Sequence, residues 1–507
     1  MIQSIGYWPS KWAHLSPDKT AIVEGERRLN FEDFNTRVNC LVNALKNDLK
    51  VKKGDRVSIL TTNRTEFIES WFAASKLGAI LTPLNFRLAE EELAYMFDDT
   101  RPRVLIYDNI FREKVEKTNP SSLGVNYIIE LNDEEHNEYE KLIKENPDEE
   151  PRTEVKITDP CVIPYTGGTT GLPKGAVLTH SNVTFHTLSM IKNTDMTAKD
   201  TTLTVLPLFH TGGLNLFTTP TIYQGGTLVL QRKFDPEETL EIIERENISI
   251  VFAVPAIFRE LAYSSKFDEA DLSSIRIFMN GGDYCPPELM EKYHEKNLNF
   301  IHSYGLTESS PGVLANRYTD DKAQEKSKEG SVGKPLFYSA VKIVDDKGEE
   351  VETGESGELL TKGPHVIEKY WNKPEETQEA FSNGWLHTGD IARRDEEDYY
   401  YIEGRKKDMI VSGGENIYLS EVERVLSSHP QVKEAAVIGV PSEKWGEVGM
   451  AIIVLEGKEK TTKEEILSYC QGKLAKYKIP KSVKFAESLP VGPAGSVDKK
   501  KLREKYA

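Results

Sequence analysis

Short apolar runs, typical of buried β-strands, alternate with helical patterns through the first three hundred residues. One run covers residues 56–60, and before it Phe34, Val38, Leu41 and Leu45 recur at helical spacing. The other predicted strands are residues 79–81, 104–107, 204–208, 227–230, 248–254, 275–280 and 299–303. Because strands separated by helices usually form parallel sheets covered by those helices, the sequence predicts an α/β fold.

The pattern changes after residue 330. Residues 331–401 contain short strands and turns, which predict a small β-barrel or sheet. A new alternation then begins, with helices predicted at 421–426 and 463–474 and strands at 435–440 and 451–455. A chain of 507 residues is too long for one core. We therefore predict a large N-terminal domain, residues 1–404, of two helix-covered, mostly parallel sheets plus the small barrel, followed by a small α+β domain, residues 405–507.

Composition excludes some classes of protein. The 64 basic and 81 acidic residues give a net charge of -17, which argues against nucleic-acid binding. The four cysteines are far apart in the sequence and suit a reducing compartment. We expect a cytoplasmic protein with no transmembrane segment, because no apolar run approaches the length that spans a bilayer. The sequence leaves peripheral membrane contact and a homodimer open. Residues 132–156 are rich in Glu, Asn, Lys and Pro, and we expect a solvated surface excursion there.

Residues 165–175, Tyr-Thr-Gly-Gly-Thr-Thr-Gly-Leu-Pro-Lys-Gly, carry the strongest functional signal. Glycines allow backbone N–H groups to approach a ligand closely, threonines add donors, and Lys174 adds a positive charge, which is the chemistry of a phosphate-binding loop. The segment is not a P-loop, because no hydroxyl residue follows the lysine. Apolar residues 161–165 and 176–179 flank it, so we predict strand, loop and strand. The alternative is a flexible hairpin without a ligand.

Seven blocks in a fixed order resemble the adenylate-forming superfamily of acyl-CoA synthetases, adenylation domains and beetle luciferases. The blocks are residues 165–175, 207–210, 281–282, 304–308, 385–390, 404–410 and 412–416. Residues 441–446 and 474–480 are most similar to those of compact bacterial fatty-acyl-CoA ligases. The resemblance implies that ATP converts a carboxylic acid, fatty or otherwise apolar, into an acyl-adenylate with release of pyrophosphate. The thiol of coenzyme A then accepts the acyl group, and Mg²⁺ assists the first step.

The resemblance also implies a role for each block. The phosphate loop would consist of Thr166, Gly167, Gly168, Thr169, Thr170 and Gly171, with Lys174 at its base. The adenine pocket would be lined by Gly281, Gly282, Asp283, Ser303, Tyr304 and Gly305. Asp390 and Arg405 would bind the ribose hydroxyls. Thr307 would contact the α-phosphate and Glu308 would bind Mg²⁺, which prefers oxygen ligands. His210 would orient or gate the reacting acid.

Further residues are implied to serve the second step. Lys407 resembles a hinge about which a mobile C-terminal domain turns between two poses. Gly413 and Gly414 would then line the tunnel for the pantetheine arm of coenzyme A, with Trp445 near its mouth.

Ser496 departs from the family pattern. Relatives carry a lysine at this position, and it reaches over the acid and the α-phosphate during adenylation. Serine is too short and carries no charge, so we expect slow adenylation and a largely intact thioester step. The substitution is either natural or engineered. Two other functions stay open: an adenylation enzyme that loads a carrier protein, and a catalytically silent binder of nucleotides or acyl-adenylates.

Overall fold

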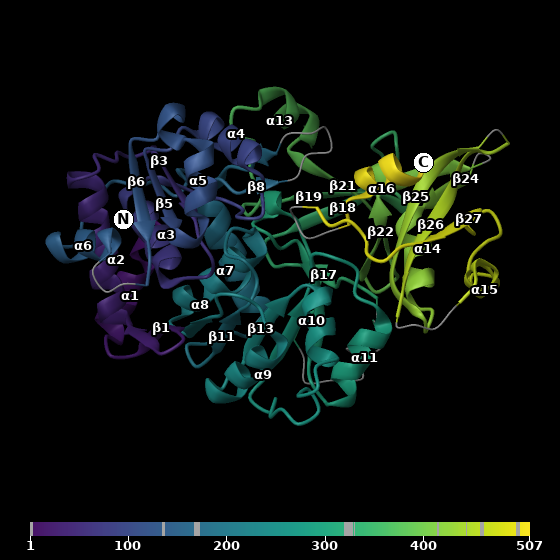
Figure 1. Ribbon diagram of the computed structural model, residues 1–507, viewed down its shortest axis with the longest axis horizontal. Helices are drawn as coiled ribbons and strands as arrows, with labels where there is room; N and C mark the ends of the chain where they lie inside the picture. Colours follow the sequence, from purple (N-terminus) through teal and green to yellow (C-terminus); the bar gives the residue numbers. More distant parts are fainter. Residues whose placement is uncertain are drawn as a thin grey trace.

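Two mostly parallel sheets form the body of the N-terminal domain, and a smaller domain follows at the C-terminus (Figure 1). The computed structural model describes residues 4–133, 137–166, 173–318, 328, 330–412, 415–442, 444–456, 461–492 and 497–507. The predicted α/β fold is confirmed in its sheets, its helical cover and the order of its parts. Among the described residues, no helix is both long enough and apolar enough to cross a lipid bilayer.

The first sheet has nine strands in the order β17-β16-β15-β14-β13-β11-β12-β1-β2. Their bounds are β1 Thr20–Glu24, β2 Arg27–Asn30, β11 Thr201–Thr204, β12 Thr227–Leu230, β13 Ile250–Ala253, β14 Ile277–Asn280, β15 Phe300–Tyr304, β16 Leu314–Ala315 and β17 Lys334–Pro335. The strands from β15 to β1 are parallel, so their carboxyl ends share one edge.

The second sheet has six strands in the order β10-β7-β4-β3-β5-β6. They are β3 Arg56–Leu60, β4 Ile80–Pro83, β5 Val104–Asp108, β6 Tyr127–Leu131, β7 Pro160–Val162 and β10 Leu178–Thr179. The predicted strand, loop and strand are confirmed, because β7 pairs with β10 and a short hairpin, β8 Tyr165–Thr166 and β9 Lys174–Gly175, flanks the phosphate loop.

Helices pack on both sheets. They are α1 Trp8–Leu15, α2 Phe31–Asn47, α3 Thr65–Leu77, α4 Glu90–Thr100, α5 Arg112–Thr118, α6 Glu138–Glu145, α7 His180–Thr194, α8 Thr218–Gln224, α9 Pro236–Arg245, α10 Pro255–Ala262 and α11 Pro287–Glu295. Helix α2 begins where the Asn30 side chain accepts from the Asp33 N–H at 2.7 Å. Its apolar face, with Phe34 and Val38, is fully buried against α3.

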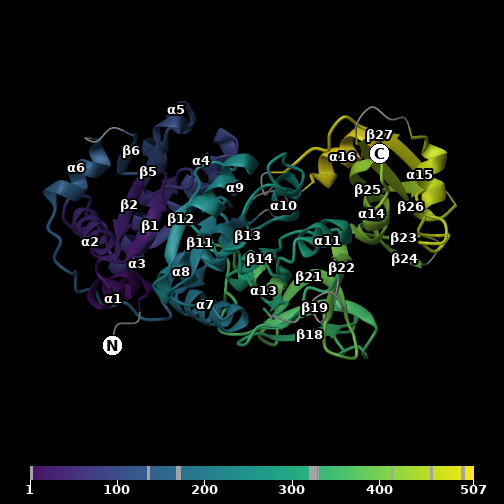
Figure 2. The same ribbon diagram turned by 90° about the horizontal axis from the view of Figure 1, so that it is seen from below.

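A five-stranded antiparallel sheet takes the place predicted for the small barrel. It comprises β18 Ala340–Val344, β19 Ser356–Lys362, β20 Phe381–Ser382, β21 Trp385–Arg394 and β22 Tyr400–Arg405, next to helix α13 Pro374–Ala380. The C-terminal domain contains β23 Met409–Ser412, β24 Glu415–Tyr418, β25 Val432–Ser442, β26 Gly446–Leu455 and β27 Ser482–Phe485 with α14 Leu419–Ser427, α15 Lys463–Tyr469 and α16 Lys499–Tyr506. Figure 2 shows this domain at one end of the molecule.

Three predicted segments differ from the structure. The strand predicted at 204–208 is β11, which ends at Thr204. The helix predicted at 463–474 ends at Tyr469, because a turn follows in which Gly472 adopts a φ of +77°. The surface excursion at 132–156 contains helix α6, whose Tyr139 is buried.

Five buried histidines make stability sensitive to acid. Burial lowers the pKa of His180, His210, His302 and His365 to about 4 and that of His186 to about 3. In an unfolded chain the pKa of each histidine is about 6.5. The unfolded state therefore binds more protons from about pH 6.5 down to 4, so the free energy of unfolding falls on acidification through this window.

Urea unfolding at about pH 7.5, above the window, and at about pH 6 and 5, within it, tests this expectation. The urea midpoint should fall with pH in the wild type, and His186→Asn should flatten that dependence. The matched control is His14→Gln, on the exposed part of α1, which should leave the slope unchanged. A midpoint that is level from neutral pH to pH 5 contradicts the prediction.

Candidate nucleotide-binding site

The carboxyl edge of the first sheet gathers most of the described candidate residues. β14 ends at Asn280 and leads into residues 281–283, while β15 ends at Tyr304 and leads into residues 305–308. Ligands of open parallel sheets bind at this edge, because loops from neighbouring strands meet there.

Tyr304, Asp390 and Arg405 meet directly. The Tyr304 hydroxyl donates to Asp390 Oδ2 at 2.5 Å, and Arg405 Nε lies 2.7 Å from Asp390 Oδ1. Asp390 and Arg405 face each other as register partners on β21 and β22. Burial, together with the Asp390 carboxylate, raises the pKa of Tyr304, so its hydroxyl stays a donor at neutral pH. Burial also raises the pKa of Asp390, and Arg405 opposes this effect. The arrangement holds a carboxylate beside an aromatic ring.

Glycine is required at Gly281 by close packing. A Cβ atom there would lie 2.6 Å from Ser303 Oγ, which itself donates to the Asn280 carbonyl at 3.0 Å. Gly282 follows with a φ of +83°, which side chains other than glycine rarely tolerate. Gly305 lies against Pro311 with no room for a side chain. The backbone on either side of Tyr304 is therefore closely packed, and only glycine fits at Gly281 and Gly305.

The surface beside this pocket belongs partly to the C-terminal domain. Asp283 is exposed, and Arg424 of α14 lies over the ring of its neighbour Tyr284, 5.2 Å from the centroid. Arg424 also donates to the carbonyls of Ile402 and Glu403 at 3.0 Å each. The small domain therefore contacts the segment that follows β14.

Glu308 and Lys174 approach the same tyrosine. The hydroxyl of Tyr370 donates to Glu308 Oε1 at 2.8 Å, and Lys174 Nζ lies 5.4 Å from the centroid of the Tyr370 ring. Thr307 and Glu308 form a short 3₁₀ turn after β15. The sequence predictions omit Tyr370, because no local pattern distinguishes residues 369–372 from an ordinary aromatic turn.

The residues present fit a magnesium ion. Mg²⁺ is usually held by one or two carboxylates together with substrate phosphates. Across the described ranges, no three His, Cys, Asp or Glu side chains cluster as a metal cage. Glu308 offers one carboxylate, and its Oε2 has no partner among the residues that the structure describes. The donor set therefore suits an ion that ATP phosphates would hold for the most part.

His210 lies in the loop after β11. Its Nε2 is buried and has no hydrogen-bond partner within the described part of the chain. The centroid of the His210 ring lies 4.3 Å from that of the Phe209 ring. Burial, together with the positive charge of Arg87, lowers the pKa of His210 to about 4. The imidazole is therefore neutral near pH 7. A buried polar atom without a partner calls for a ligand or water, which suits a substrate-facing role.

Several candidate residues lie outside the cluster or outside the description. Lys407 is exposed in the turn between β22 and β23, and Trp445, 43% exposed, lies between β25 and β26. Thr166, on β8, donates to the Lys174 carbonyl at 3.4 Å. The residues outside the described ranges are Gly167, Gly168, Thr169, Thr170, Gly171, Gly413, Gly414 and Ser496.

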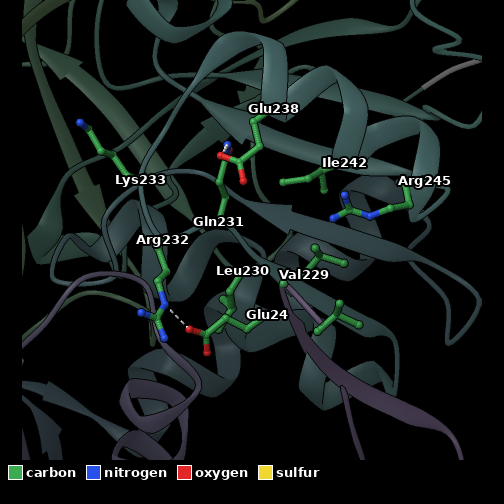
Figure 3. A pocket seen from close by; sticks show the side chains of 11 residues that line it. Glu24, Val229, Leu230, Gln231, Arg232, Lys233, Glu238, Ile242 and Arg245 are labelled. Carbon is green, nitrogen blue, oxygen red and sulfur yellow. Dashed lines mark hydrogen bonds and ion pairs between the residues drawn. The ribbon is translucent and has the colours of Figure 1, made fainter. Parts of the chain in front are cut away.

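A cavity of about 360 Å³ lies elsewhere on the first sheet, beside β1, β12 and α9 (Figure 3). Its buried polar groups are already paired. Arg232 donates to Glu24 at 2.5 Å and to Asp133 at 3.0 Å, and Gln231 donates to Glu238 at 3.0 Å. This cavity therefore takes no part in the site.

Comparison with known proteins covers nearly the whole chain. The family model for AMP-binding enzymes matches residues 10–371, and the model for the AMP-binding enzyme C-terminal domain matches residues 421–495. A feruloyl-CoA synthase of Amycolatopsis sp. is 38% identical over 504 residues, 99% of each chain. The long-chain-fatty-acid–CoA ligase FadD13 of Mycobacterium tuberculosis is 36% identical over 512 residues, covering 100% of this chain and 99% of that one.

A solved structure with bound ligands is also similar. The O-succinylbenzoate coenzyme A synthetase of Bacillus subtilis, in complex with ATP and magnesium ion, is 32% identical. It superposes with a TM-score of 0.87 over 98% of this chain and 99% of that chain. Sequence and fold thus agree on the same group of proteins.

Proposed function

The chain belongs to the AMP-binding enzyme family of acyl-CoA ligases, and on that premise we propose that it joins an apolar carboxylic acid to coenzyme A at the expense of ATP. The contact of Tyr304 and Arg405 with the buried Asp390 carries the proposal, because it presents an aromatic face beside a carboxylate that can accept both ribose hydroxyls. An adenosine group needs both features.

The chemistry runs in two steps. A carboxylate oxygen of the acid attacks the α-phosphorus of ATP, the bond to the β-phosphate oxygen breaks, and pyrophosphate leaves. The thiol of coenzyme A, losing its proton, then attacks the acyl carbon, and AMP leaves. Thr307 contacts the α-phosphate, Lys174 and residues 166–171 hold the outer phosphates, and neutral His210 orients the acid. Magnesium, held by Glu308 and the phosphates, would neutralise charge that develops during the first step.

The division of labour between domains is part of the proposal. Residues 1–404 bind ATP and the acid, and residues 405–507 turn about Lys407 between the steps. The position of Lys407 in an exposed turn between two strands supports a pivot there. Gly413, Gly414 and Trp445 serve the coenzyme A thiol in the second pose.

The acid is expected to be apolar. Residues 210–213, 254–258 and 279–281 are mostly small or apolar, which supports an apolar acid. The similar proteins are named for acids as different as ferulate, long-chain fatty acids and O-succinylbenzoate, a dicarboxylic acid, so their names fix neither the length nor the polarity of the acid.

A matched pair of acids tests this specificity. With ATP, Mg²⁺ and coenzyme A, kcat/KM for hexanoate should exceed that for adipate by roughly tenfold or more, because burying a second, unpaired carboxylate is costly. A wider panel of aliphatic and aromatic acids then identifies the preferred substrate. Equal rates for both members of the pair contradict the apolar pocket.

The same assay separates the rival functions. Acyl transfer to free coenzyme A supports the ligase. Transfer only to a carrier protein supports a stand-alone adenylation enzyme. Binding of ATP without AMP formation, also in Ser496→Lys, supports a silent binder.

A further inference from the structure

We propose that Tyr370 is a positioning residue that orients the Glu308 carboxylate toward the cation and ties both flanks of the phosphate loop to it. This inference rests on the proposed function, in which Glu308 and the loop act on the same triphosphate.

The hydroxyl contact is specific and protected from water. Tyr370 Oη lies 2.8 Å from Glu308 Oε1, and the tyrosine is only 9% exposed. Hydrogen bonds to a charged group are among the stronger ones in proteins. The bond occupies Oε1 and leaves Oε2 for a cation. Without it, the carboxylate would rotate more freely about its side-chain bonds.

The backbone around Tyr370 fixes the tyrosine relative to Glu308. The Ile367 N–H donates to the Glu308 carbonyl at 2.8 Å, and the Tyr370 N–H donates to Thr377 Oγ1 at 3.0 Å. The hydroxyl donor therefore has a set position even before a ligand binds.

The same segment holds the strand on the carboxyl side of the phosphate loop. Trp371 N donates to the Gly175 carbonyl at 2.7 Å, Val177 N donates to the Lys369 carbonyl at 3.2 Å, and Tyr370 pairs with Ala176 in an antiparallel bridge. The Tyr370 ring also faces Lys174 Nζ, a favourable cation–π geometry.

The amino-terminal flank is held through Asp99. The Tyr165 hydroxyl donates to Asp99 Oδ2 at 2.5 Å, while Trp371 Nε1 and Asn372 Nδ2 donate to the Asp99 carbonyl at 3.1 Å each. Residues 370–372 therefore bond directly to the carboxyl-side flank of the loop and, through Asp99, to its amino-side flank. The Tyr370 hydroxyl adds the bond to the carboxylate that is implied to bind magnesium.

Tyr370→Phe removes the hydroxyl and keeps the ring that faces Lys174. Calorimetric titration of the full chain should show that the Kd for ATP in the presence of Mg²⁺ rises roughly 10-fold. The Kd for ATP in EDTA should change by less than about twofold, since only the metal-directed carboxylate is disturbed.

Tyr107→Phe is the matched control. Tyr107 is also a buried tyrosine that donates to a glutamate, Glu130, at 2.6 Å, but it lies in the second sheet. This variant should leave both constants unchanged. A melting temperature of Tyr370→Phe close to that of the wild type excludes loss of fold as the cause.

Each other outcome is decisive. An unchanged Kd in Mg²⁺, or an equal loss in Mg²⁺ and in EDTA, overturns the positioning role while leaving the proposed function intact. A wild-type protein that binds no ATP with Mg²⁺ overturns the proposed function and this inference with it.

Discussion

Replacing Ser496 with lysine is expected to raise the rate of acyl-AMP formation about 10²–10³-fold, the range by which removal of one donor aimed at developing charge slows an enzyme. The family places a lysine at this position, where its ammonium group reaches the acid and the α-phosphate. Serine supplies neither the reach nor the charge.

Two of the three lysines that follow Ser496, Lys499 and Lys501, are engaged in ion pairs. Lys499 Nζ lies 2.9 Å from Glu423 Oε1, with 18% of its side chain exposed, and Lys501 lies 3.5 Å from Asp498. Using Lys499 in catalysis would leave Glu423 without its cation. We therefore expect that the chain as it stands adenylates slowly.

Pyrophosphate release measures the first step, and thioester formation from supplied acyl-AMP measures the second. Ser496→Lys should accelerate only the first. Ser496→Ala is the control and should leave both rates near those of the wild type. If lysine changes neither rate, the alignment of residues 489–503 with the family is wrong.

Asp390→Ala is expected to lower kcat/KM for ATP roughly 10²- to 10⁴-fold. The carboxylate is proposed to hold two ribose hydroxyls, and each charged hydrogen bond contributes about 1.5–3 kcal/mol. The substitution also leaves the Arg405 guanidinium and the Tyr304 hydroxyl without their partner, so both donors lose the orientation seen here.

Asp395→Ala is the matched control, since Asp395 is an aspartate in the turn between β21 and β22. It accepts from the Tyr399 N–H at 2.9 Å and from Lys328 at 3.2 Å. It should lower thermal stability without changing the ATP dependence of the rate. Asp390→Asn keeps the side-chain volume and should cost less than Asp390→Ala. A normal KM for ATP in both Asp390 variants would remove this residue from the site.

The hydrophobic pattern predicted the strands of the two large sheets well wherever an apolar run also pairs with a neighbouring strand. It misplaced β11, because residues 205–209 are buried without being a strand. Asn63 explains how: its side chain donates to the Leu206 carbonyl at 3.0 Å and accepts from the Leu208 N–H at 2.9 Å. A side-chain amide 143–145 residues away in the sequence thus replaces the hydrogen bonds of a neighbouring strand. Hydrogen bonds between residues so far apart in the sequence cannot be predicted from the local hydrophobic pattern.

The site shows the same limit. Ordered motifs predicted Tyr304, Glu308, Asp390 and Arg405 as site residues. They could not show that the hydroxyl of Tyr304 contacts Asp390, or that Tyr370 contacts Glu308 from 62 positions further along the chain. These contacts depend on how β15, β21 and the segment before α13 pack, which motif spacing does not encode.

The ion pair of Asp390 with Arg405 has one more consequence. Arg405 is the last residue of β22, two positions before the proposed pivot at Lys407, whereas Asp390 lies within β21. A nucleotide bound between them would contact the fixed part of the enzyme and the start of the moving part together. Binding of ATP and the orientation of the small domain are then linked equilibria. If ATP shifts the domain towards one orientation by some factor, holding the domain in that orientation must increase the affinity for ATP by the same factor.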